Sequence, residues 1–365
     1  MRKLFLFFFL FASYNGHAQA LLNGLENLFT EPESYIARYT QTAPLIDGII
    51  TENSWEKAPW SENFKDIEGS KQPVPAFQTR MKMLWNDTCL FIAAELQEPH
   101  IWAMLRNHDD IVFHDNDFEV FIDPDNNTHQ YYEIEVNALN TIFDLFMPKP
   151  YRNLSGAMIN WDLAKLRSGI NIKGTLNEAT DKDSSWTVEM AIPFRSVLMG
   201  NVTGTPREGE IWRINFSRVE WDTEIRDGKY IKKKDPSGRN KPEHNWVWSP
   251  QGVINMHFPE RWGYLQFTRK ESDAAVVFEL PYPEKQKKYL WLCYYRQKEY
   301  FTKNRRYASS LKDLGIDTPG VTIDNRTNTL QMEATSQQFM ATIAEDTVNL
   351  ISINDEGLIR GLRNR

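Results

Sequence analysis

The sequence predicts a mainly β protein: an antiparallel β-sandwich followed by a small α+β domain at the C-terminal end. Short segments with alternating apolar and polar residues recur from residue 35 to residue 269, and a period of two is typical of strands that pack on one face. Turn residues such as Asn86 and Asp87 separate these segments. Beyond residue 283, a run without glycine or proline predicts a helix over residues 284–304, and strand-like segments follow it.

Five segments carry the alternation most clearly, at residues 79–85, 118–123, 131–138, 186–192 and 212–217. In the second of them, Phe118, Val120 and Ile122 form the apolar set, and Glu119 belongs to the polar set. Antiparallel sheets commonly pack one face against the core and leave the other face polar. The pattern therefore predicts sheets stacked through their apolar faces.

The chain divides into five expected parts. They are a signal peptide at 1–20, a lead-in segment at 21–34, the sandwich at 35–269, a linker at 270–283 and the small α+β domain at 284–365. Cys89 and Cys293, the only two cysteines, fall in different domains, so both are expected to be unpaired and buried.

The first residues are typical of an export signal. A basic Met1-Arg2-Lys3 start precedes the short apolar run 4–12, and Ala18-Gln19-Ala20 supplies a cleavage site with small residues. The apolar run is too short to span a bilayer, which needs about 20 residues. We therefore expect an exported protein, periplasmic or extracellular, with no membrane span.

Composition narrows the range of functions. The 365 residues include 42 basic and 49 acidic side chains, a formal net charge of −7, which argues against a dedicated nucleic-acid binder. The 12 tryptophans fit either flat stacking surfaces or a β-rich core and do not decide between them. The sequence contains no nucleophile elbow, HExxH, Walker loop or GxGxxG motif.

An acidic loop near residue 110 is the nearest approach to a metal-binding pattern. His108 and His114 lie there among four aspartates, Asp109, Asp110, Asp115 and Asp117. A solvated acidic loop is the favoured interpretation. The alternative is a hard-cation site, with calcium as the possible cofactor and Asp115 and Asp117 as its ligands.

Polar strand faces indicate a binding surface. Glu133, Glu135 and Asn137 share one face of a predicted strand, Glu119 lies on the polar side of another, and Asn215 on the polar side of a third. Carboxylates and amides suit sugar hydroxyls, because each hydroxyl both donates and accepts hydrogen bonds. An ordinary solvent-facing surface fits the same pattern, and paired carboxylates are also compatible with glycoside hydrolysis.

Aromatic side chains in loops or at strand ends could stack on sugar rings, although core packing is the favoured interpretation for any single one. They are Phe113, Trp161, Trp221, Trp246 and Trp248. The candidate carbohydrate-binding set is Phe113, Glu119, Glu133, Glu135, Asn137, Asn215, Arg218, Trp221 and Trp248.

Six segments taken together resemble family 9 carbohydrate-binding modules, which occur attached to xylanases and in many exported bacterial proteins. They are residues 44–48 with Glu52 and Trp55, residues 83–92, 116–124, 186–194, 212–218 and 257–265. The resemblance implies a β-sandwich related to the DOMON fold and a non-catalytic role in binding polysaccharide. It does not cover the C-terminal domain, which is only loosely similar to the heads of pilin-like proteins.

The resemblance also implies roles for individual residues. Glu119 falls on a carboxylate that hydrogen-bonds sugar in the family, and residues 133–137 fall where members place further polar contacts. Members hold a sugar between two tryptophan rings, and those positions fall near Phe113 and Met256 here.

Four functions remain open at this point. The leading hypothesis is an exported, non-catalytic protein that binds xylan or cellulose fragments in polysaccharide catabolism. A glycosidase would use two of four carboxylates, Glu119, Glu133, Glu135 and Asp144. A haem-binding DOMON-type carrier would use Met256 and His257 as axial ligands. An assembly module would contact a partner protein through the C-terminal domain.

Overall fold

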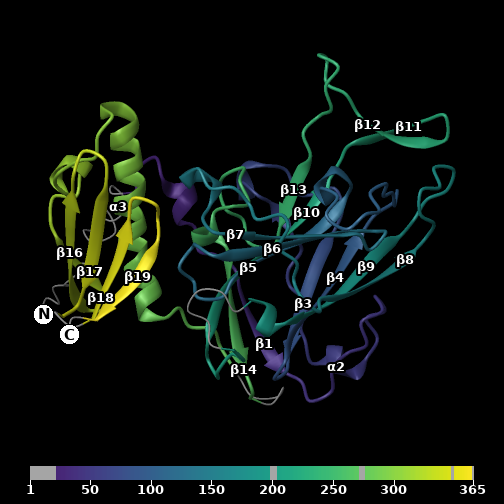
Figure 1. The fold of residues 1–365 in the computed structure, drawn as a ribbon, viewed down its shortest axis with the longest axis horizontal. Helices are drawn as coiled ribbons and strands as arrows, with labels where there is room; N and C mark the ends of the chain where they lie inside the picture. Colours follow the sequence, from purple (N-terminus) through teal and green to yellow (C-terminus); the bar gives the residue numbers. More distant parts are fainter. Residues whose placement is uncertain (1–21, 198–203, 271–275, 347–348, 364–365) are drawn as a thin grey trace, which may run out of the picture. The chain divides into compact units, whose positions relative to one another are not determined.

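The computed structural model describes residues 22–197, 204–270, 276–346 and 349–363 (Figure 1). Two compact units make up the chain: residues 31–279 form one, and residues 280–365 form the other together with the segment that ends at Thr30. The predicted signal peptide lies outside the described residues. Among the described residues, no helix combines the length and the apolar character needed to cross a bilayer.

The unit of residues 31–279 is built on one large curled sheet. Its hydrogen-bonded order is β7-β6-β5-β10-β14-β1-β3-β4-β9-β8, with β13 pairing to β10 and β2 to β13. The strands are β1 (Ser34–Tyr39), β2 (Lys65–Asp66), β3 (Thr79–Trp85), β4 (Cys89–Gln97), β5 (Asp117–Asp123), β6 (Tyr131–Asn137), β7 (Ile142–Met147), β8 (Arg167–Lys173), β9 (Ser185–Pro193), β10 (Ile211–Glu220), β13 (His244–Val247) and β14 (Gly263–Thr268).

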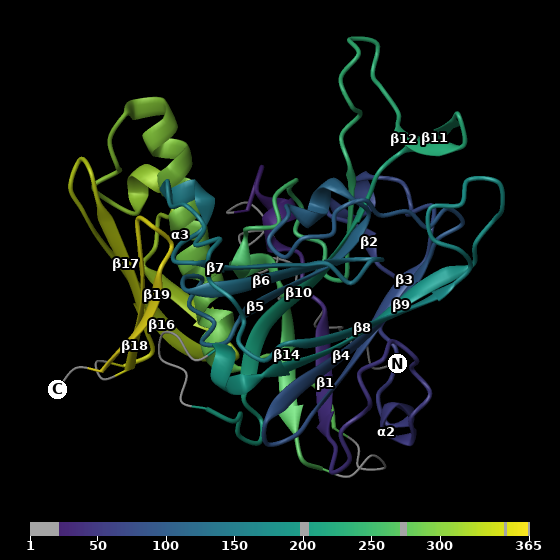
Figure 2. The ribbon, with the colours of Figure 1, turned by 45° about the vertical axis from the view of Figure 1, so that its right-hand side comes forward.

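Smaller elements decorate this sheet. A separate hairpin of β11 (Thr223–Arg226) and β12 (Lys229–Lys232) projects away from it (Figure 2). The short helices of this unit are α2 (Asn53–Glu56), η2 (Gly69–Lys71), η3 (Val112–His114), η4 (Tyr151–Asn153), η5 (Phe194–Val197) and η6 (Pro259–Arg261).

The mainly β, sandwich-like fold predicted from the sequence is confirmed, with one difference in strand direction. Strand β1 runs parallel to both of its neighbours, β14 and β3, whereas the other paired strands in the described sheet are antiparallel. Strand β1 lies in the middle of the sheet order, where it joins β7-β6-β5-β10-β14 to β3-β4-β9-β8. Alternation within a strand reports its faces, but not the direction of its neighbours.

The main core lies between the two halves of this sheet. Phe118, Val120 and Ile122 of β5 are buried in a cluster that also takes Met83 of β3 and Val188 of β9. These residues come from both ends of the sheet order, so the sheet curls until its apolar faces pack on each other. The odd-numbered residues of β5 consequently point to the opposite face.

A buried carboxylate fixes the loop at residues 47–55 to the sheet. Glu189 of β9 accepts hydrogen bonds from Gly48 N at 2.8 Å, Asp47 N at 3.2 Å and Trp55 Nε1 at 2.6 Å. Gly48 has φ +87°, and a Cβ atom there would lie 2.4 Å from the backbone of Ile170. The first and fourth segments of the family resemblance therefore meet here in a structural role.

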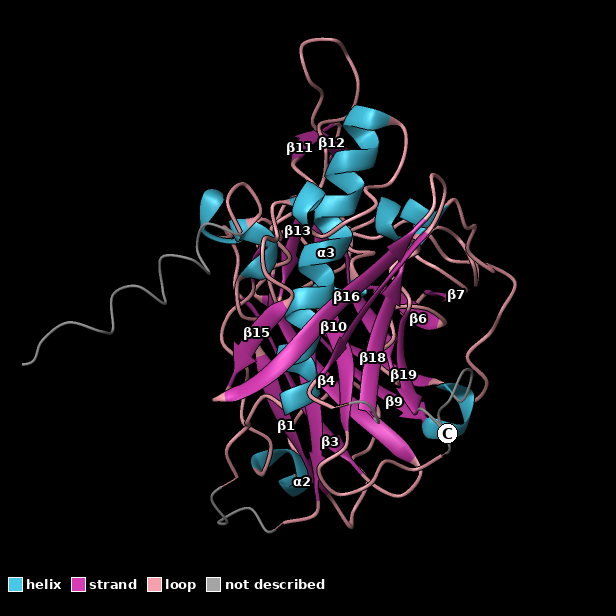
Figure 3. Ribbon diagram, turned by 90° about the vertical axis from the view of Figure 1, so that its left-hand side faces the viewer, coloured by secondary structure: helices cyan, strands magenta, loops and turns pink. Residues whose placement is uncertain are grey.

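In the second unit, α3 (Tyr282–Asn304) packs on a five-stranded antiparallel sheet (Figure 3). The strands follow chain order: β15 (Gly320–Ile323), β16 (Arg326–Ala334), β17 (Phe339–Ala344), β18 (Asn349–Asn354) and β19 (Ile359–Arg363). Two short helices belong to the same unit, η1 (Glu26–Phe29) and η7 (Lys312–Leu314).

Part of the expected lead-in belongs to this second unit. The Phe29 ring meets Tyr295 of α3 edge-on, with ring centroids 6.0 Å apart, and Arg296 donates a hydrogen bond to the Asn23 carbonyl. Cys89 and Cys293 are both buried and free, as the sequence predicts.

Candidate functional site

A pocket of about 530 Å³ opens on the face of β5, β6, β7 and β10 that points away from the main core. Its size falls in the range typical of small-ligand sites. The lining residues are Ile67, Ile111, Phe113, Glu119, Phe121, Glu133, Glu135, Phe143, Leu145, Tyr151, Ile159, Val219, Glu243, Asn245, Ile254, Asn255, Met256 and His257.

The strand register brings three of the candidate carboxylates into this pocket. Glu119 of β5 stands directly opposite Glu135 of β6, and Glu133 is opposite Phe121. Each of the three carboxylates is less than 6% exposed. Asp117 joins them from β5, and its carboxylate offers an oxygen within 4.8 Å of oxygens of Glu119 and Glu135. Opposed like charges are unfavourable unless protons or ligands intervene.

Burial raises the pKa values of these carboxylic acids. It raises the pKa of Glu119 from its ordinary 4.5 to about 7. Burial, reinforced by the neighbouring carboxylates, also raises the pKa of Asp117, Glu133 and Glu135 well above the usual range. The site therefore retains protons near neutral pH, and a protonated carboxyl group donates a hydrogen bond as well as accepting one.

Several of these oxygens accept no hydrogen bond within the described residues, although Glu133 Oε2 lies 3.7 Å from His257 Nε2. Asp117 Oδ2, Glu119 Oε2 and Glu133 Oε2 are buried and accept no hydrogen bond within the described residues. By contrast, Glu135 Oε2 accepts one from Phe113 N at 2.8 Å. Buried polar atoms are normally hydrogen-bonded, so unpartnered oxygens that line a pocket indicate contacts made by a ligand.

Aromatic rings stand beside the carboxylates. Phe113 is half-buried at the pocket edge, and Tyr151 is 44% exposed. Tyr151 and His257 meet edge-on with ring centroids 4.4 Å apart, and His257 Nδ1 lies 2.8 Å from the Tyr131 hydroxyl. Burial lowers the pKa of His257 to about 4, so its ring is neutral at physiological pH.

Tyr151 and His257 are pocket residues that the candidate carbohydrate set lacks. Both lie outside the strands, Tyr151 in η4 and His257 just before η6. Proline on either side of Lys149 marks the Tyr151 segment as a loop, but no periodicity in the sequence aims that loop at the pocket.

Asn137 and Asn215 lie away from the pocket lining because the backbone uses their amides. Asn137 Nδ2 donates to the Leu105 carbonyl at 3.0 Å, and its Oδ1 accepts from Thr141 N. Asn215 Nδ2 donates to the carbonyl of Ser249, and Oδ1 accepts from Ser249 N, both at 3.0 Å. Both amides thus act as bridges between loops and strands.

Arg218 is also outside the pocket lining. Its guanidinium is 1% exposed and is held between Glu98 and Glu220, with 2.7 Å from Nη2 to an oxygen of each. A paired and enclosed guanidinium is not available to a sugar, and loss of either carboxylate would leave a buried charge less well compensated.

The two candidate tryptophans are buried as well. Trp221 packs with Trp102 and donates from Nε1 to the Phe113 carbonyl at 2.9 Å, so it supports the pocket edge without lining it. Trp248 belongs to the main core, where it contacts the Phe216 ring.

Asp115 and Asp117 do not converge on one point. Asp115 Oδ2 accepts hydrogen bonds from Met104 N, Leu105 N and Asn137 Nδ2, which makes it a clamp for the preceding loop. Asp117 instead belongs to the carboxylate group of the pocket. Calcium binding at Asp117 stays a prediction, with Glu119 and Glu135 as its neighbours.

The haem alternative meets a geometric obstacle. Met256 is buried, and its sulfur accepts a hydrogen bond from Gln251 at 3.1 Å. The adjacent His257 already pairs with Tyr131 through Nδ1. Met256 and His257 are consecutive in the chain and line the same pocket, and two adjacent residues do not readily ligate opposite faces of a haem.

A curled β-sandwich that carries a pocket with buried carboxylates on one sheet face has the features of a ligand-binding domain. The chain belongs to the carbohydrate family 9 binding domain-like family, whose family model matches residues 46–249. This match includes the strands that carry the pocket carboxylates.

Three of the solved structures that are similar to this chain come from two organisms. One is a protein from Bacteroides uniformis proposed to bind carbohydrate, with 15% identity and a TM-score of 0.48, over 65% of this chain and 100% of that one. Another is a family 9 carbohydrate-binding module from Caldicellulosiruptor kristjanssonii in complex with cellotriose, with 16% identity and a TM-score of 0.40, over 68% of this chain and 100% of that one. A family 9 carbohydrate-binding module from the same organism, in complex with glucose, has 14% identity and a TM-score of 0.40, over 67% of this chain and 100% of that one. The search of curated proteins returned no match.

Proposed function

We propose that this protein is an exported, non-catalytic carbohydrate-binding protein whose ligand occupies the pocket over β5, β6 and β7. The observation that carries the proposal is a pair of buried carboxylate oxygens, on Glu119 and Glu133, that accept no hydrogen bond from the described residues. They lie beside aromatic rings in a member of a carbohydrate-binding family. The sequence resemblance makes fragments of xylan or cellulose the first ligands to consider.

Sugar chemistry matches both parts of the pocket. Hydroxyl groups would donate to Glu119 Oε2 and Glu133 Oε2, which accept no hydrogen bond from the described residues. The apolar C–H face of a pyranose ring would stack on Phe113 or Tyr151, the two aromatic rings at the more open part of the lining.

The shared burial of the carboxylates favours binding over hydrolysis. In glycosidases each of the two carboxyl groups has its own protonation state. Here burial raises the pKa values of Asp117, Glu119 and Glu135 in the same direction. Nothing in this arrangement divides the acids into one proton donor and one ionised partner.

Calorimetric titration with xylohexaose, cellohexaose and glucose tests the proposal. With a pKa of about 7, Glu119 is partly ionised at neutral pH, and Glu119→Gln removes this acceptor. A hydrogen bond contributes about 0.5–1.5 kcal/mol between neutral groups and about 1.5–3 kcal/mol to a charged group, so we expect affinity to fall roughly 2- to 150-fold. Glu95→Gln is the matched control, because Glu95 lies on β4 and pairs with Arg80 outside the pocket lining. Absence of binding across a broad panel of glycans would overturn the proposal.

Export and a protein partner are separate parts of the proposal. The sequence of residues 1–20 supports export, and N-terminal sequencing of the protein secreted by its host would locate the predicted cut after Ala20. The second unit, with α3 on a five-stranded sheet, is proposed to contact a partner protein. Crosslinking in the host with and without residues 280–365 tests that contact.

A further inference from the structure

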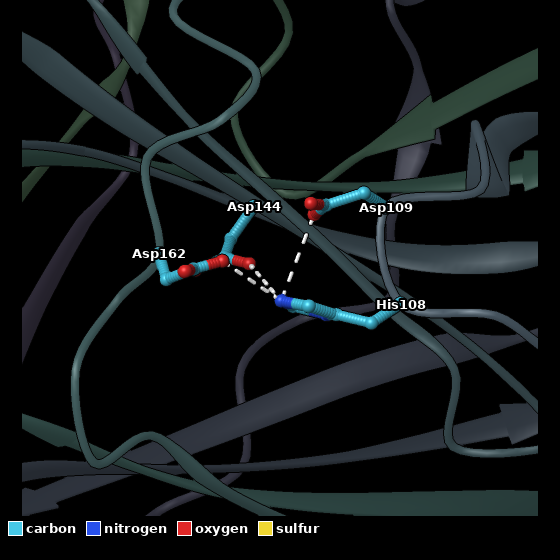
Figure 4. A group of neighbouring side chains, drawn as sticks. All are labelled: His108, Asp109, Asp144 and Asp162. Carbon is cyan, nitrogen blue, oxygen red and sulfur yellow. Dashed lines mark hydrogen bonds and ion pairs between the residues drawn. The ribbon is translucent and has the colours of Figure 1, made fainter.

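A second group of ionisable side chains lies near β7, on the sheet face opposite to the pocket. Figure 4 shows its four members, His108, Asp109, Asp144 and Asp162. Asp144 comes from β7 itself, and its neighbours Phe143 and Leu145 point the other way and line the pocket. His108 and Asp109 come from the turn before η3, and Asp162 comes from the segment after the β-bridge of Met158. One atom of each of the four side chains lies within 4.8 Å of the others.

The imidazole of His108 is oriented by the backbone. Its Nδ1 lies 3.1 Å from the Ile142 carbonyl oxygen, which can only accept, so Nδ1 carries the proton of this hydrogen bond. Nε2 lies 2.9 Å from Asp162 Oδ1, an oxygen that likewise accepts, so without a metal ion Nε2 also carries a proton, and an ion bound there would displace that proton. A backbone acceptor at one ring nitrogen is the usual support for a histidine that binds metal through the other.

Three carboxylate oxygens surround His108 Nε2. His108 Nε2 is 2.9 Å from Asp162 Oδ1, 3.7 Å from Asp109 Oδ1 and 3.8 Å from Asp144 Oδ1. Zinc bonds to nitrogen and oxygen are about 2.0–2.2 Å long, so ligand atoms in a tetrahedral site are roughly 3.3–3.5 Å apart. The observed separations lie on either side of that value, and a small adjustment of two exposed side chains would equalise them.

A buried oxygen in this group lacks a hydrogen bond. The Asp144 side chain is 2% exposed, and its Oδ2 accepts a hydrogen bond from Leu163 N. Its Oδ1 is buried and accepts no hydrogen bond within the described residues, although it points toward His108 Nε2 (Figure 4). His108 Nε2, 3.8 Å away, is beyond hydrogen-bond distance, so this oxygen keeps an acceptor site for a ligand such as a metal ion.

We propose that His108, Asp109, Asp144 and Asp162 bind a divalent first-row transition-metal ion, with zinc as the best fit. One imidazole nitrogen with carboxylate oxygens suits zinc, whereas calcium takes oxygen ligands alone. The ion would join three chain segments, residues 107–110, β7 and the segment around Asp162. It would thereby stabilise the edge of the sheet next to the carbohydrate pocket without entering that pocket.

Titration of the untagged full chain, stripped with EDTA and then supplied with ZnCl₂, tests the inference. We expect one equivalent to bind and the thermal midpoint to rise as zinc is added. Cobalt as a replacement probe should give the intense visible absorption of a four-coordinate ion.

Three single substitutions test the proposed ligands, and a fourth substitution serves as the control. His108→Ala and Asp162→Asn alter exposed side chains and should fold, and each should weaken zinc binding at least 10-fold, as should Asp144→Asn. His244→Ala is the matched control, since His244 is similarly exposed and faces the single carboxylate of Asp222 at 3.3 Å. The inference would be overturned if His108→Ala and Asp162→Asn left the zinc affinity unchanged. It would also be overturned if the His244→Ala control lost zinc affinity equally, because the bound zinc would then be an adventitious ion only.

Discussion

Two buried carboxylate sites lie on the two halves of the same sheet, and they differ in how their oxygens are used. On β9, both oxygens of Glu189 accept hydrogen bonds from the 47–55 loop. On β5 and β6, Glu119 Oε2 and Glu133 Oε2 accept none within the described residues and border a pocket. The first arrangement holds the fold together, and the second is available to a ligand.

Burial alone does not separate the two sites. It raises the pKa of both Glu189 and Glu119 to about 7. The difference lies in the donors: Glu189 is surrounded by N–H groups, and Glu119 faces another carboxylate across the strand pair. A shifted pKa therefore points to function only when the hydrogen-bond partners are counted as well.

The largest expected effect is on the structural site. Glu189→Ala leaves Trp55 Nε1, Gly48 N and Asp47 N without their acceptor, and each buried unpaired group costs about 1–3 kcal/mol. We expect a loss of about 3–5 kcal/mol in the free energy of unfolding. Urea titration followed by tryptophan fluorescence measures it.

Glu119→Gln provides the opposing comparison, since it replaces an acid that repels its neighbours. It should leave the unfolding midpoint at pH 7 unchanged or raise it. If Glu119→Gln destabilised the protein as much as Glu189→Ala does, the distinction between the two sites would be wrong.

The next effect concerns pH. Because the folded-state pKa of Glu119 is raised from 4.5 to about 7, its protonated form stabilises the fold. That contribution is fully present below about pH 4.5 and is lost as pH rises through about 7, by on the order of 1–3 kcal/mol. Between pH 4 and pH 8, the free energy of unfolding should fall more steeply for the wild type than for Glu119→Gln, as measured by urea titration at each pH. Parallel curves would contradict the assignment.

The smallest effect concerns ring stacking. Both polar contacts of Phe113 are made by its backbone, to Glu135 and to Trp221, so Phe113→Ala removes the ring alone. A stacking contact contributes about 0.5–1.5 kcal/mol, which corresponds to roughly 2- to 13-fold weaker oligosaccharide binding by calorimetry. Phe113→Trp should restore or strengthen binding. Equal affinity in all three proteins would place the sugar away from this ring.

The sequence predicts the faces of strands well and the surroundings of each face poorly. Period two correctly separates Phe118 from Glu119, because successive side chains point to opposite sides of a strand. It also groups Asn137 with Glu135, but a loop around Leu105 covers Asn137 and leaves Glu135 at the pocket. How far covering loops extend along a strand depends on tertiary contacts that alternation does not encode.

Long-range partners explain the other differences. Tyr151 and His257 reach the pocket from loops separated by more than 100 residues, and His108 meets Asp144 and Asp162 only after the chain has folded. Residue types suggested an acidic cluster near residue 110, and the fold alone identifies which of its members converge.

A crystal structure of the protein soaked with xylotriose or cellotriose tests the central claim most directly. The account predicts a sugar over β5 and β6, with hydroxyl oxygens about 2.5–3.0 Å from Glu119 Oε2 or Glu133 Oε2. A sugar bound only outside this pocket, with both carboxylates untouched, would contradict it.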